Sequence, residues 1–547
     1  MTTTLSAPLP APLSVRRVLG DHPFAEIGKP VVAVRNEARG EVAVGGSLGD
    51  LSWPGRQVQG WDGHRVAVYG TGDLGCRHLV SSHWPVRSLA FHPTLPLLAV
   101  GTGAYDGGYM FEGELLLVDL TDGTVVSALE HHREVRQVSW REDGRALGLL
   151  LAPPDEDSAE KPFSRGFEVL VEREDWRTVT GRSVTSRELT GPSAKAKRGR
   201  GAAKKAARAL LAGLADGWSP RRQVWAVEAL ADGRVLAALE GTALECWLPD
   251  GEPGWSLPDA DGGRQLSVLP DATAAWVHVP RPTRWTGSEW EDVAGTVELR
   301  SLADGSLVGT AEVPFPASMT ADTRGWVALR DTRVEKSKSA LVLVSPEGRV
   351  VTGPTVGGYD PFNHHLDVRR SPELLFLQGK RKKPWKDKRL VSLTPATETG
   401  RGEVHELFPL EWDTDRKGHL FGGPAVRLST GGEALVHAGR VHHGHGLMPG
   451  HVFVARRSFP DGAPQWLLTA DHPVTALDTD GRTVYAAFTS GELAALDAVD
   501  GTVRWRIPLE VDGTPTVALS LTAAAPGRLL LGTVDGRILD CSVGEAG

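Results

Sequence analysis

Residues 86–129 read VRSLAFHPTLPLLAVGTGAYDGGYMFEGELLLVDLTDGTVVSAL, and residues 135–151 read VRQVSWREDGRALGLLL. In both stretches, short apolar runs are separated by an Asp-Gly pair, Asp122-Gly123 in the first and Asp143-Gly144 in the second. Asp-Gly between two apolar runs is typical of a tight hairpin that joins antiparallel strands. The first stretch therefore predicts a unit of four antiparallel strands, and the second predicts the start of another.

Similar units recur along the whole chain. We place them at residues 31–80, 86–129, 135–190, 224–257, 264–313, 317–352, 364–410, 424–468, 473–507 and 515–547. Repeated four-strand units are typical of β-propeller blades. The sequence thus predicts an all-β fold, a β-propeller of about ten four-stranded antiparallel blades, with one large ring favoured over two smaller propellers.

The last unit has only three apolar runs, and one further run near the N-terminus belongs to no other unit. This run, SVRRVLG at residues 14–20, could supply the missing outer strand and so remove an open sheet edge. We therefore expect an N-terminal lead and closing strand at residues 1–30 and a propeller at 31–547. Two insertions interrupt the propeller, a basic helical one at 190–222 and a basic loop at 379–389.

The repeat resembles the WD-repeat and quinoprotein-like β-propeller superfamilies, although no unit combines a Gly-His start with a Trp-Asp end. Ala495, Asp497, Gly501 and Trp505 also match the tryptophan-docking motif of pyrroloquinoline-quinone dehydrogenases, A-x-D-x-x-x-G-x-x-x-W. The resemblance implies a structural role, because the Trp of that motif clamps neighbouring blades. Those enzymes also use a calcium site and an adjacent cysteine pair, and this sequence has no such pair.

Composition narrows the class of protein further. The 547 residues carry a formal net charge of −8 and are 41% hydrophobic, which is enough for a packed core. The first residues do not resemble a signal peptide, and no apolar run is long enough for a membrane helix. Three widely spaced cysteines suit a reducing compartment, so we expect a cytoplasmic protein, and the abundant Ala, Gly and Arg resemble the composition of high-GC bacteria such as actinomycetes.

Long segments are concentrated at one end of the predicted units. The Asp-Gly turns join the first strand to the second or the third to the fourth, whereas the second-to-third connections are mostly long: 45–63, 101–113, 153–165, 280–294, 331–339, 379–389 and 439–450. Long loops on a rigid scaffold are where binding usually resides, although surface loops also tolerate length at little cost. We expect a macromolecular partner to bind this loop-rich face, with the tryptophans as candidate contacts: Trp53, Trp61, Trp285, Trp290 and Trp385.

Two of the insertions are strongly basic. Residues 195–208 contain seven Lys and Arg and no acid, and residues 380–389 contain seven against Asp387. Such segments attract acidic protein surfaces, nucleic acids or anionic lipids, or they remain solvated without a partner. The candidate contacts are Lys197, Arg198, Arg200, Lys380, Arg381, Lys382 and Lys383. Residues 202–214 favour a helix, whose leucines would dock on the propeller or on a partner.

Motifs for catalysis or metal binding are sparse. The sequence contains no G-x-S-x-G, H-E-x-x-H or Walker loop. His442, His443, His445 and His451 are candidate metal ligands, but a glycine-rich histidine loop without a nearby carboxylate more often binds metal adventitiously. We therefore expect no cofactor and favour a non-catalytic scaffold that binds a protein partner, the alternatives being a nucleic-acid-binding propeller and an enzyme or small-ligand binder that uses the central channel.

Overall fold

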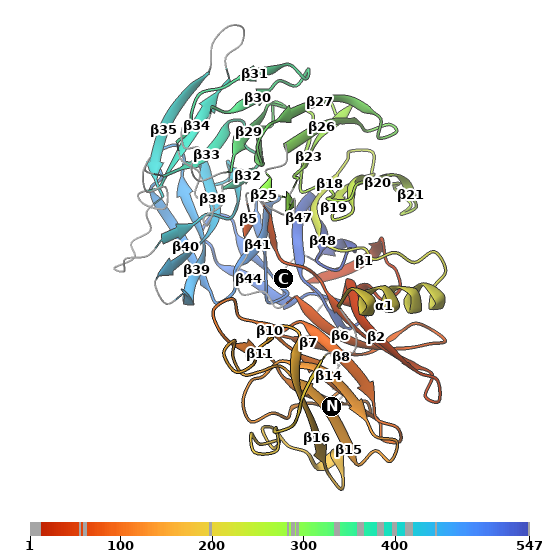
Figure 1. Cartoon of the computed structure of the whole chain (residues 1–547). Helices are drawn as coiled ribbons and strands as arrows, with labels where there is room; N and C mark the ends of the chain where they lie inside the picture. Colours follow the sequence, from red (N-terminus) through yellow and green to blue (C-terminus); the bar gives the residue numbers. More distant parts are fainter. Residues whose placement is uncertain are drawn as a thin grey trace, which may run out of the picture. The chain divides into compact units, whose positions relative to one another are not determined.

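A computed structural model describes residues 12–544 except 54–55, 58–62, 196–199, 282–283, 286–289, 292–294, 333–339, 358–365, 380–387, 396–401, 411–418 and 444–445 (Figure 1). Strands dominate these residues, and most of them form four-stranded antiparallel sheets. The expected all-β class is therefore confirmed, and the sheets are compatible with a β-propeller. In the described ranges, no helix is both long and apolar enough to cross a membrane.

The chain divides into two compact units. The large unit comprises Met1–Asp21, Leu51–Trp61 and Gln223–Gly547, and the small unit comprises His22–Asp50 and Asp62–Arg222. Each unit has its own sheets and its own hydrophobic clusters, and each is described by itself below.

Among the residues that the structure describes, the large unit contains seven consecutive sheets, apart from short hairpins. The first three are β18 (Val224–Ala229), β19 (Val235–Leu239), β20 (Thr242–Trp247) and β21 (Pro253–Pro258); β22 (Gln265–Val268), β23 (Ala274–Val279), β26 (Gly295–Ser301) and β27 (Leu307–Val313); β28 (Ala317–Ala321), β29 (Val327–Asp331), β30 (Val342–Val344) and β31 (Val350–Thr352). The fourth and fifth are β33 (Leu374–Gln378), β34 (Arg389–Thr394) and β35 (Glu403–Pro409); β37 (Pro424–Leu428), β38 (Ala434–His443), β39 (Gly446–Ser458) and β40 (Pro464–Ala470), with β36 (His419–Phe421) beside β38. The sixth and seventh are β41 (Val474–Thr479), β42 (Thr483–Phe488), β43 (Glu492–Asp497) and β44 (Val503–Pro508); β47 (Ala518–Ala525), β48 (Arg528–Thr533), β49 (Ile538–Val543) and β1 (Leu13–Leu19). Three two-stranded hairpins accompany them: β4 (Ser52–Trp53) with β5 (Arg56–Gln57), β24 (Arg284–Trp285) with β25 (Trp290–Glu291), and β45 (Glu510–Val511) with β46 (Thr514–Pro515).

Hydrophobic side chains fill the space between each of these sheets and the next. Leu236 of the first sheet and Val277 of the second belong to one buried cluster, and similar clusters join the following sheets pairwise. The seventh and first sheets also share a cluster, to which Leu530, Val224 and Leu19 contribute. Burial of this apolar surface is the main force that holds neighbouring sheets together.

The N-terminal strand completes the last sheet, as the sequence predicts. β1 pairs antiparallel with β49 from Leu13 opposite Val543 to Leu19 opposite Ile538. Arg17 strengthens this edge because its Nε lies 3.0 Å from a carboxylate oxygen of Asp540. The outer edge of β49 is therefore covered by a strand from the opposite end of the chain.

The fourth sheet departs from the expected pattern. The predicted unit at 364–410 should have four strands, but only three of its strands pair with one another, because β32 (Asp367–Arg369) pairs in parallel with β37 of the fifth sheet. Arg370, which directly follows β32, has φ 57°, a left-handed conformation, so the chain bends between β32 and β33. The prediction of a regular four-stranded unit is therefore wrong at this position.

Tryptophans clamp two pairs of neighbouring sheets. The ring of Trp466 on β40 covers Gly501 in the Asp-Gly turn of the sixth sheet, and Trp255 on β21 covers Gly305 in the equivalent turn of the second sheet. Trp466 Nε1 also donates a hydrogen bond of 3.3 Å to Ala498 O. Trp505, the tryptophan of the docking motif, packs against the cluster between the sixth and seventh sheets.

Replacing Gly501 with Ala should lower the free energy of unfolding by about 2–4 kcal/mol. A Cβ at this position would lie 2.7 Å from the Trp466 ring, and φ of 76° is unfavourable for alanine. Gly513 is a matched control, since its φ is also 76° but no heavy atom lies within 4 Å of an added Cβ. Urea titrations should show a loss of only about 1 kcal/mol for Gly513→Ala, and equal losses in the two variants would contradict a clamp by Trp466.

The small unit contains three further sheets. They are β2 (Lys29–Asn36), β3 (Glu41–Ser47), β6 (His64–Gly70) and β7 (Cys76–Ser82); β8 (Val86–Phe91), β9 (Leu97–Thr102), β12 (Leu115–Asp119) and β13 (Val125–Ser127); β14 (Val135–Trp140), β15 (Ala146–Leu151), β16 (Arg165–Glu172) and β17 (Ser193–Lys195). The unit also holds a hairpin of β10 (Ala104–Tyr105) and β11 (Phe111–Glu112), and two 3-10 helices at Ala25–Ile27 and Trp176–Thr178. Shared clusters join the first sheet to the second and the second to the third.

The predicted helix is present as α1 (Arg200–Leu214) and packs beside β2 (Figure 1). Leu211 is fully buried, and Leu210 and Leu214 are partly buried against the first sheet of the small unit. The leucines of the helix are therefore used within the protein itself, one of the two outcomes that the sequence left open. The outer strand β17 lies at residues 193–195, inside the segment that we expected to be a helical insertion.

Candidate functional site

A polar cavity of about 250 Å³ lies in the large unit. Its walls come from residues on or beside β18, β22, β28 and β32, three of which are the first strands of consecutive sheets. Charged residues of both signs line it: Glu228, Arg264, Asp322, Asp367, Arg369 and Arg370. In a propeller the first strands surround the central channel. This cavity is therefore the place where a site for a small ligand, one of the alternatives left open by the sequence, would be expected.

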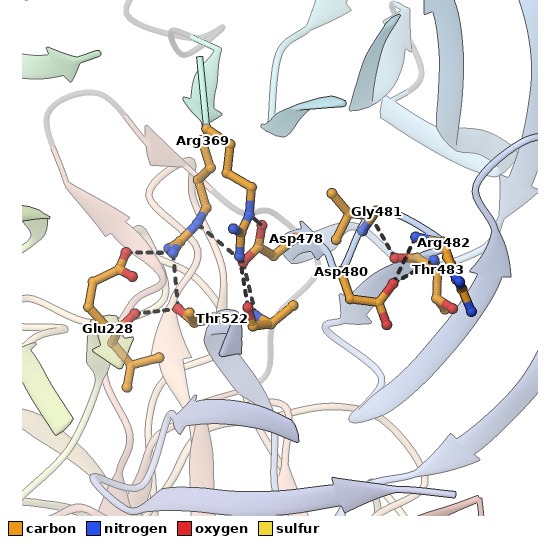
Figure 2. Close-up of polar contacts among 12 residues, drawn as sticks. Glu228, Arg369, Asp478, Asp480, Gly481, Arg482, Thr483 and Thr522 are labelled. Carbon is orange, nitrogen blue, oxygen red and sulfur yellow. Dashed lines mark hydrogen bonds and ion pairs between the residues drawn. The ribbon is translucent and has the colours of Figure 1, made fainter. Parts of the chain in front are cut away.

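Arg369 connects β32 to two other first strands (Figure 2). Its Nη2 donates to Glu228 Oε1 at 2.5 Å and to Thr522 Oγ1 at 3.0 Å. Glu228 belongs to β18 and Thr522 to β47. The guanidinium of Arg369 therefore bonds to the first and the seventh sheets. The strand that carries Arg369, β32, pairs with β37 of the fifth sheet.

Arg370 makes a second connection, to the sixth and seventh sheets. Its Nε and Nη2 donate to the two carboxylate oxygens of Asp478 at 2.7 and 2.9 Å. The backbone N–H of Ala523 also donates to Asp478, at 2.9 Å, and Arg370 donates to the carbonyl oxygen of Ala523 at 2.8 Å. Paired hydrogen bonds between a guanidinium and a carboxylate are among the strongest polar contacts in proteins.

The pKa values of these groups reflect burial and pairing. Burial raises the pKa of Glu228, and Arg369 beside it acts in the opposite direction. Burial alone would lower the pKa of Arg369, but the carboxylates of Glu228 and Asp478 outweigh this effect and raise it. The hydrogen bonds to Asp478 raise the pKa of Arg370, so both arginines stay charged at any physiological pH.

The network of Glu228, Arg369, Arg370 and Asp478 fits a structural role, as a brace between strands, better than a catalytic role. Glu228 contacts a cavity and has a pKa raised by burial, two features that occur at catalytic sites. Its carboxylate is nevertheless bonded to Arg369, and the cavity is smaller than the roughly 300–1,000 Å³ that is usual for ligand pockets. Asp478 and Arg370 likewise satisfy each other, so the network holds the first strands together.

A second candidate site is formed by two long loops of the small unit. These are residues 101–113, which connect β9 to β12, and 153–165, which connect β15 to β16. Phe111 N donates to Pro154 O at 3.1 Å, and Glu156 N donates to Tyr109 O at 3.2 Å. The two second-to-third loops therefore lie side by side, as their shared end of the sheets predicts.

Aromatic rings join these loops. The ring centroids of Tyr105, Phe111 and Phe163 lie 5.2 Å apart in each of the three pairs. Phe111 is buried at the base, whereas Phe163 is 63% exposed. Arg136 lies beneath them, with its guanidinium carbon 5.2 Å from the centre of the Phe111 ring. We call the five apolar or aromatic residues of this surface the aromatic loop patch: Tyr105, Tyr109, Met110, Phe111 and Phe163.

Carboxylates hold the backbone of the patch in place. Asp106 Oδ1 accepts hydrogen bonds of 2.7 to 3.0 Å from three backbone N–H groups, at residues 108, 109 and 110, and these bonds lower the pKa of Asp106. Tyr109 donates from its hydroxyl to Asp157 at 2.8 Å. A hydrogen bond to Glu156 raises the pKa of Tyr105 to about 12. The patch is therefore built on hydrogen-bonded loops.

The predicted tryptophan contacts are only partly placed by the structure. Trp53 lies in β4, and Trp285 and Trp290 occupy opposite positions in the backbone register of the β24–β25 hairpin. Their role as partner contacts stays a prediction. Trp61 and Trp385 lie outside the described residues.

The predicted basic contacts lie mostly beyond the described part of the chain. Arg200 is the first residue of α1. Lys197, Arg198, Lys380, Arg381, Lys382 and Lys383 are outside the described residues. Their proposed role therefore remains a prediction.

The histidine loop is described in part. His442 and His443 lie in β38 and His451 in β39, where β38 and β39 form a long hairpin, and His445 is outside the described residues. Among the side chains that the structure describes, no group of three His, Cys, Asp or Glu is arranged to hold a metal ion.

Sequence reasoning placed loops 101–113 and 153–165 on the loop-rich face and left open a site at the centre of the ring, but it named none of the residues that form the two sites described above. The clue to the aromatic loop patch is the aromatic content of two predicted loops, YDGGYMF at 105–111 and Phe163, which contain no tryptophan. No comparable clue exists for Arg369 and Arg370, since their partners are more than 100 residues away. Comparison of the sequence with known protein-family models found no match, and comparison with curated proteins found none either.

Proposed function

We propose that this protein is a non-catalytic scaffold of β-propeller architecture that binds a macromolecular partner, in the first place a protein, through the loop-rich ends of its sheets. The observation that carries this proposal is the aromatic loop patch, where two neighbouring second-to-third loops are packed together and present exposed aromatic side chains. At the opposite end of the same sheets, Asp122-Gly123 and Asp143-Gly144 form short turns. Exposed apolar surface on ordered loops is typical of interaction sites.

For the large unit we propose a closed ring of seven blades, related in architecture to the WD-repeat and quinoprotein-like propellers. Three observations support it: the cluster shared by the seventh and first sheets, the bond of 2.8 Å from Ser520 Oγ to Val224 O between their first strands, and the pairing of β1 with β49. The three sheets of the small unit would then lie outside that ring, so this proposal departs both from one ring of about ten blades and from two smaller propellers.

The centre of that proposed ring supports the scaffold rather than the enzyme alternative. Arg369 and Arg370 bond to first strands of the first, sixth and seventh sheets, so charged side chains that line the cavity are engaged in linking strands. We further propose a cytoplasmic location, which the three free cysteines support.

A variant with four charges removed distinguishes a nucleic-acid partner from an acidic protein partner. In this variant Gln replaces Lys380, Arg381, Lys382 and Lys383. For a nucleic-acid partner, binding of a labelled DNA duplex should fall, and its salt slope should flatten by about 0.9 for each phosphate that the variant no longer neutralises. For an acidic protein partner, captured by cross-linking from the native host, association should slow while dissociation changes little. Unchanged affinity and an unchanged salt response for both would remove residues 380–383 from the binding surface.

Shortening the two loops that form the aromatic loop patch tests the proposed binding function directly. Replacing residues 104–112 and 155–163 with tight turns should leave the sheets folded, because loop residues contribute little to the shared clusters. The shortened protein should lose at least about tenfold in affinity for the captured partner. A partner that binds the shortened protein and the intact protein equally well would contradict a binding role for these loops.

A further inference from the structure

We infer that the aromatic loop patch binds a basic protein segment in which an apolar or aromatic anchor is flanked by Lys or Arg. This inference rests on the proposed function and specifies the chemistry of its partner. Three properties of the two loops support this inference: their exposed apolar side chains, their negative charge and the hydrogen bonds that hold them.

Apolar exposure marks the patch as a place where a partner can be anchored. Phe163, Tyr109 and Met110 are 63%, 43% and 41% exposed. They lie on loops that contact each other, since Met110 bridges to Asp155. Aromatic residues and Met are enriched at protein interfaces, and large aromatic anchors dominate the energy of binding.

The charge around the patch selects the partner. The two loops contain six carboxylates and two cations; the carboxylates are Asp106, Glu112, Asp155, Glu156, Asp157 and Glu160, and the cations are Lys161 and Arg165. Glu160 and Asp157 are exposed. A negative rim around an apolar centre attracts cationic segments and repels acidic ones, and Arg or Lys can also stack on Phe163 or Tyr109.

Hydrogen bonds within the small unit hold both loops. Asp106 and Asp155 bind the backbone N–H groups that follow them, and Arg136 donates to the carbonyl oxygens of Pro162 and Arg165 at 2.8 and 2.6 Å. A surface held in this way loses little conformational freedom on binding, which favours affinity. Asp106 and Asp155 therefore have two effects: they add negative charge to the rim, and they hold the loop backbone in place.

Selection of phage-displayed random 12-residue peptides on the intact protein tests the inference. Peptides that bind the wild-type protein but are depleted on the Phe163→Ser variant should carry an apolar or aromatic residue flanked by Lys or Arg. Their affinity should fall at least about tenfold in Phe163→Ser. Glu160→Lys should weaken them by about threefold to tenfold, mainly through slower association.

Matched substitutions in the same unit serve as controls. Leu170 is 46% exposed on β16, and Leu170→Ser should leave the affinity of the peptides unchanged. Glu142 is exposed in the tight turn between β14 and β15, and Glu142→Lys should do the same. Circular dichroism should show that all four variants melt like the wild-type protein, since each replaced side chain is exposed.

Acidic or uncharged peptides, peptides indifferent to Phe163→Ser, or no recovered peptide would each overturn the inference. Sedimentation should also show that the wild-type protein does not self-associate through this patch. Self-association abolished by Phe163→Ser would instead identify a second copy of the chain, with its own basic segments, as the occupant. The proposed function fails on a different result, namely a captured partner that is unaffected by shortening both loops.

Discussion

Replacing Asp478 with Asn should lower the free energy of unfolding of the large unit by about 2–3 kcal/mol, because the buried carboxylate gives up charge-assisted hydrogen bonds although its partner Arg370 is 43% exposed. The Asp478 side chain is 0% exposed and accepts hydrogen bonds from Arg370 and from the backbone of Ala523. The variant leaves Arg370 without its counter-charge and Arg369 with one carboxylate fewer nearby. A urea titration monitored by circular dichroism measures the loss.

Glu492→Gln is the matched control for this experiment. Glu492 pairs with Arg506 at 2.6 Å in the same sheet, but both side chains are about one-third exposed. Such a pair contributes at most about 1 kcal/mol. If Asp478→Asn cost no more than Glu492→Gln, the network around Arg369 and Arg370 would not be the brace that its geometry indicates.

Deleting residues 1–20 should lower the melting temperature of the large unit by about 5–10 °C. The deletion removes β1, so β49 loses its pairing partner and becomes an open edge. It also removes Leu19 from the cluster between the seventh and first sheets and Arg17 from Asp540. Arg17 further donates to Pro249 O at 2.6 Å, a bond that reaches the first sheet.

A shorter deletion, of residues 1–11, is the control because it leaves β1 intact. Its melting curve should match that of the full chain. The longer deletion should in addition increase aggregation, since an unpaired strand edge can pair with another molecule. Identical melting of the two truncated proteins would show that β1 does not support the large unit.

The repeats were readable from the sequence because their signals are local. Alternating apolar runs and Asp-Gly turns depend on residues a few positions apart, so most of the sheets, though not the unit at 364–410, lie where they were expected. The outer strand β1 could be predicted by counting: the last unit lacked one strand and residues 14–20 had no other place. The helix at 200–214 followed from its composition.

The division into two units was not visible in the sequence, since neighbouring repeats look alike whether or not their sheets pack in one body. The position of β32 was equally hidden. Asp367–Arg369 reads as an ordinary first strand, and only Glu228, Asp478 and β37, all distant in sequence, draw it out of its own sheet.

The sequence by itself determined the strands, the turns that join them and the end of the sheets at which the long loops emerge, because hydrophobic periodicity and turn chemistry act over short distances. Only the tertiary structure decided which strands share a sheet around Arg369 and Arg370 and which loop residues meet at the aromatic loop patch. Those outcomes depend on the pairing of charges and the packing of rings between segments far apart in the chain, and no local pattern encodes such contacts.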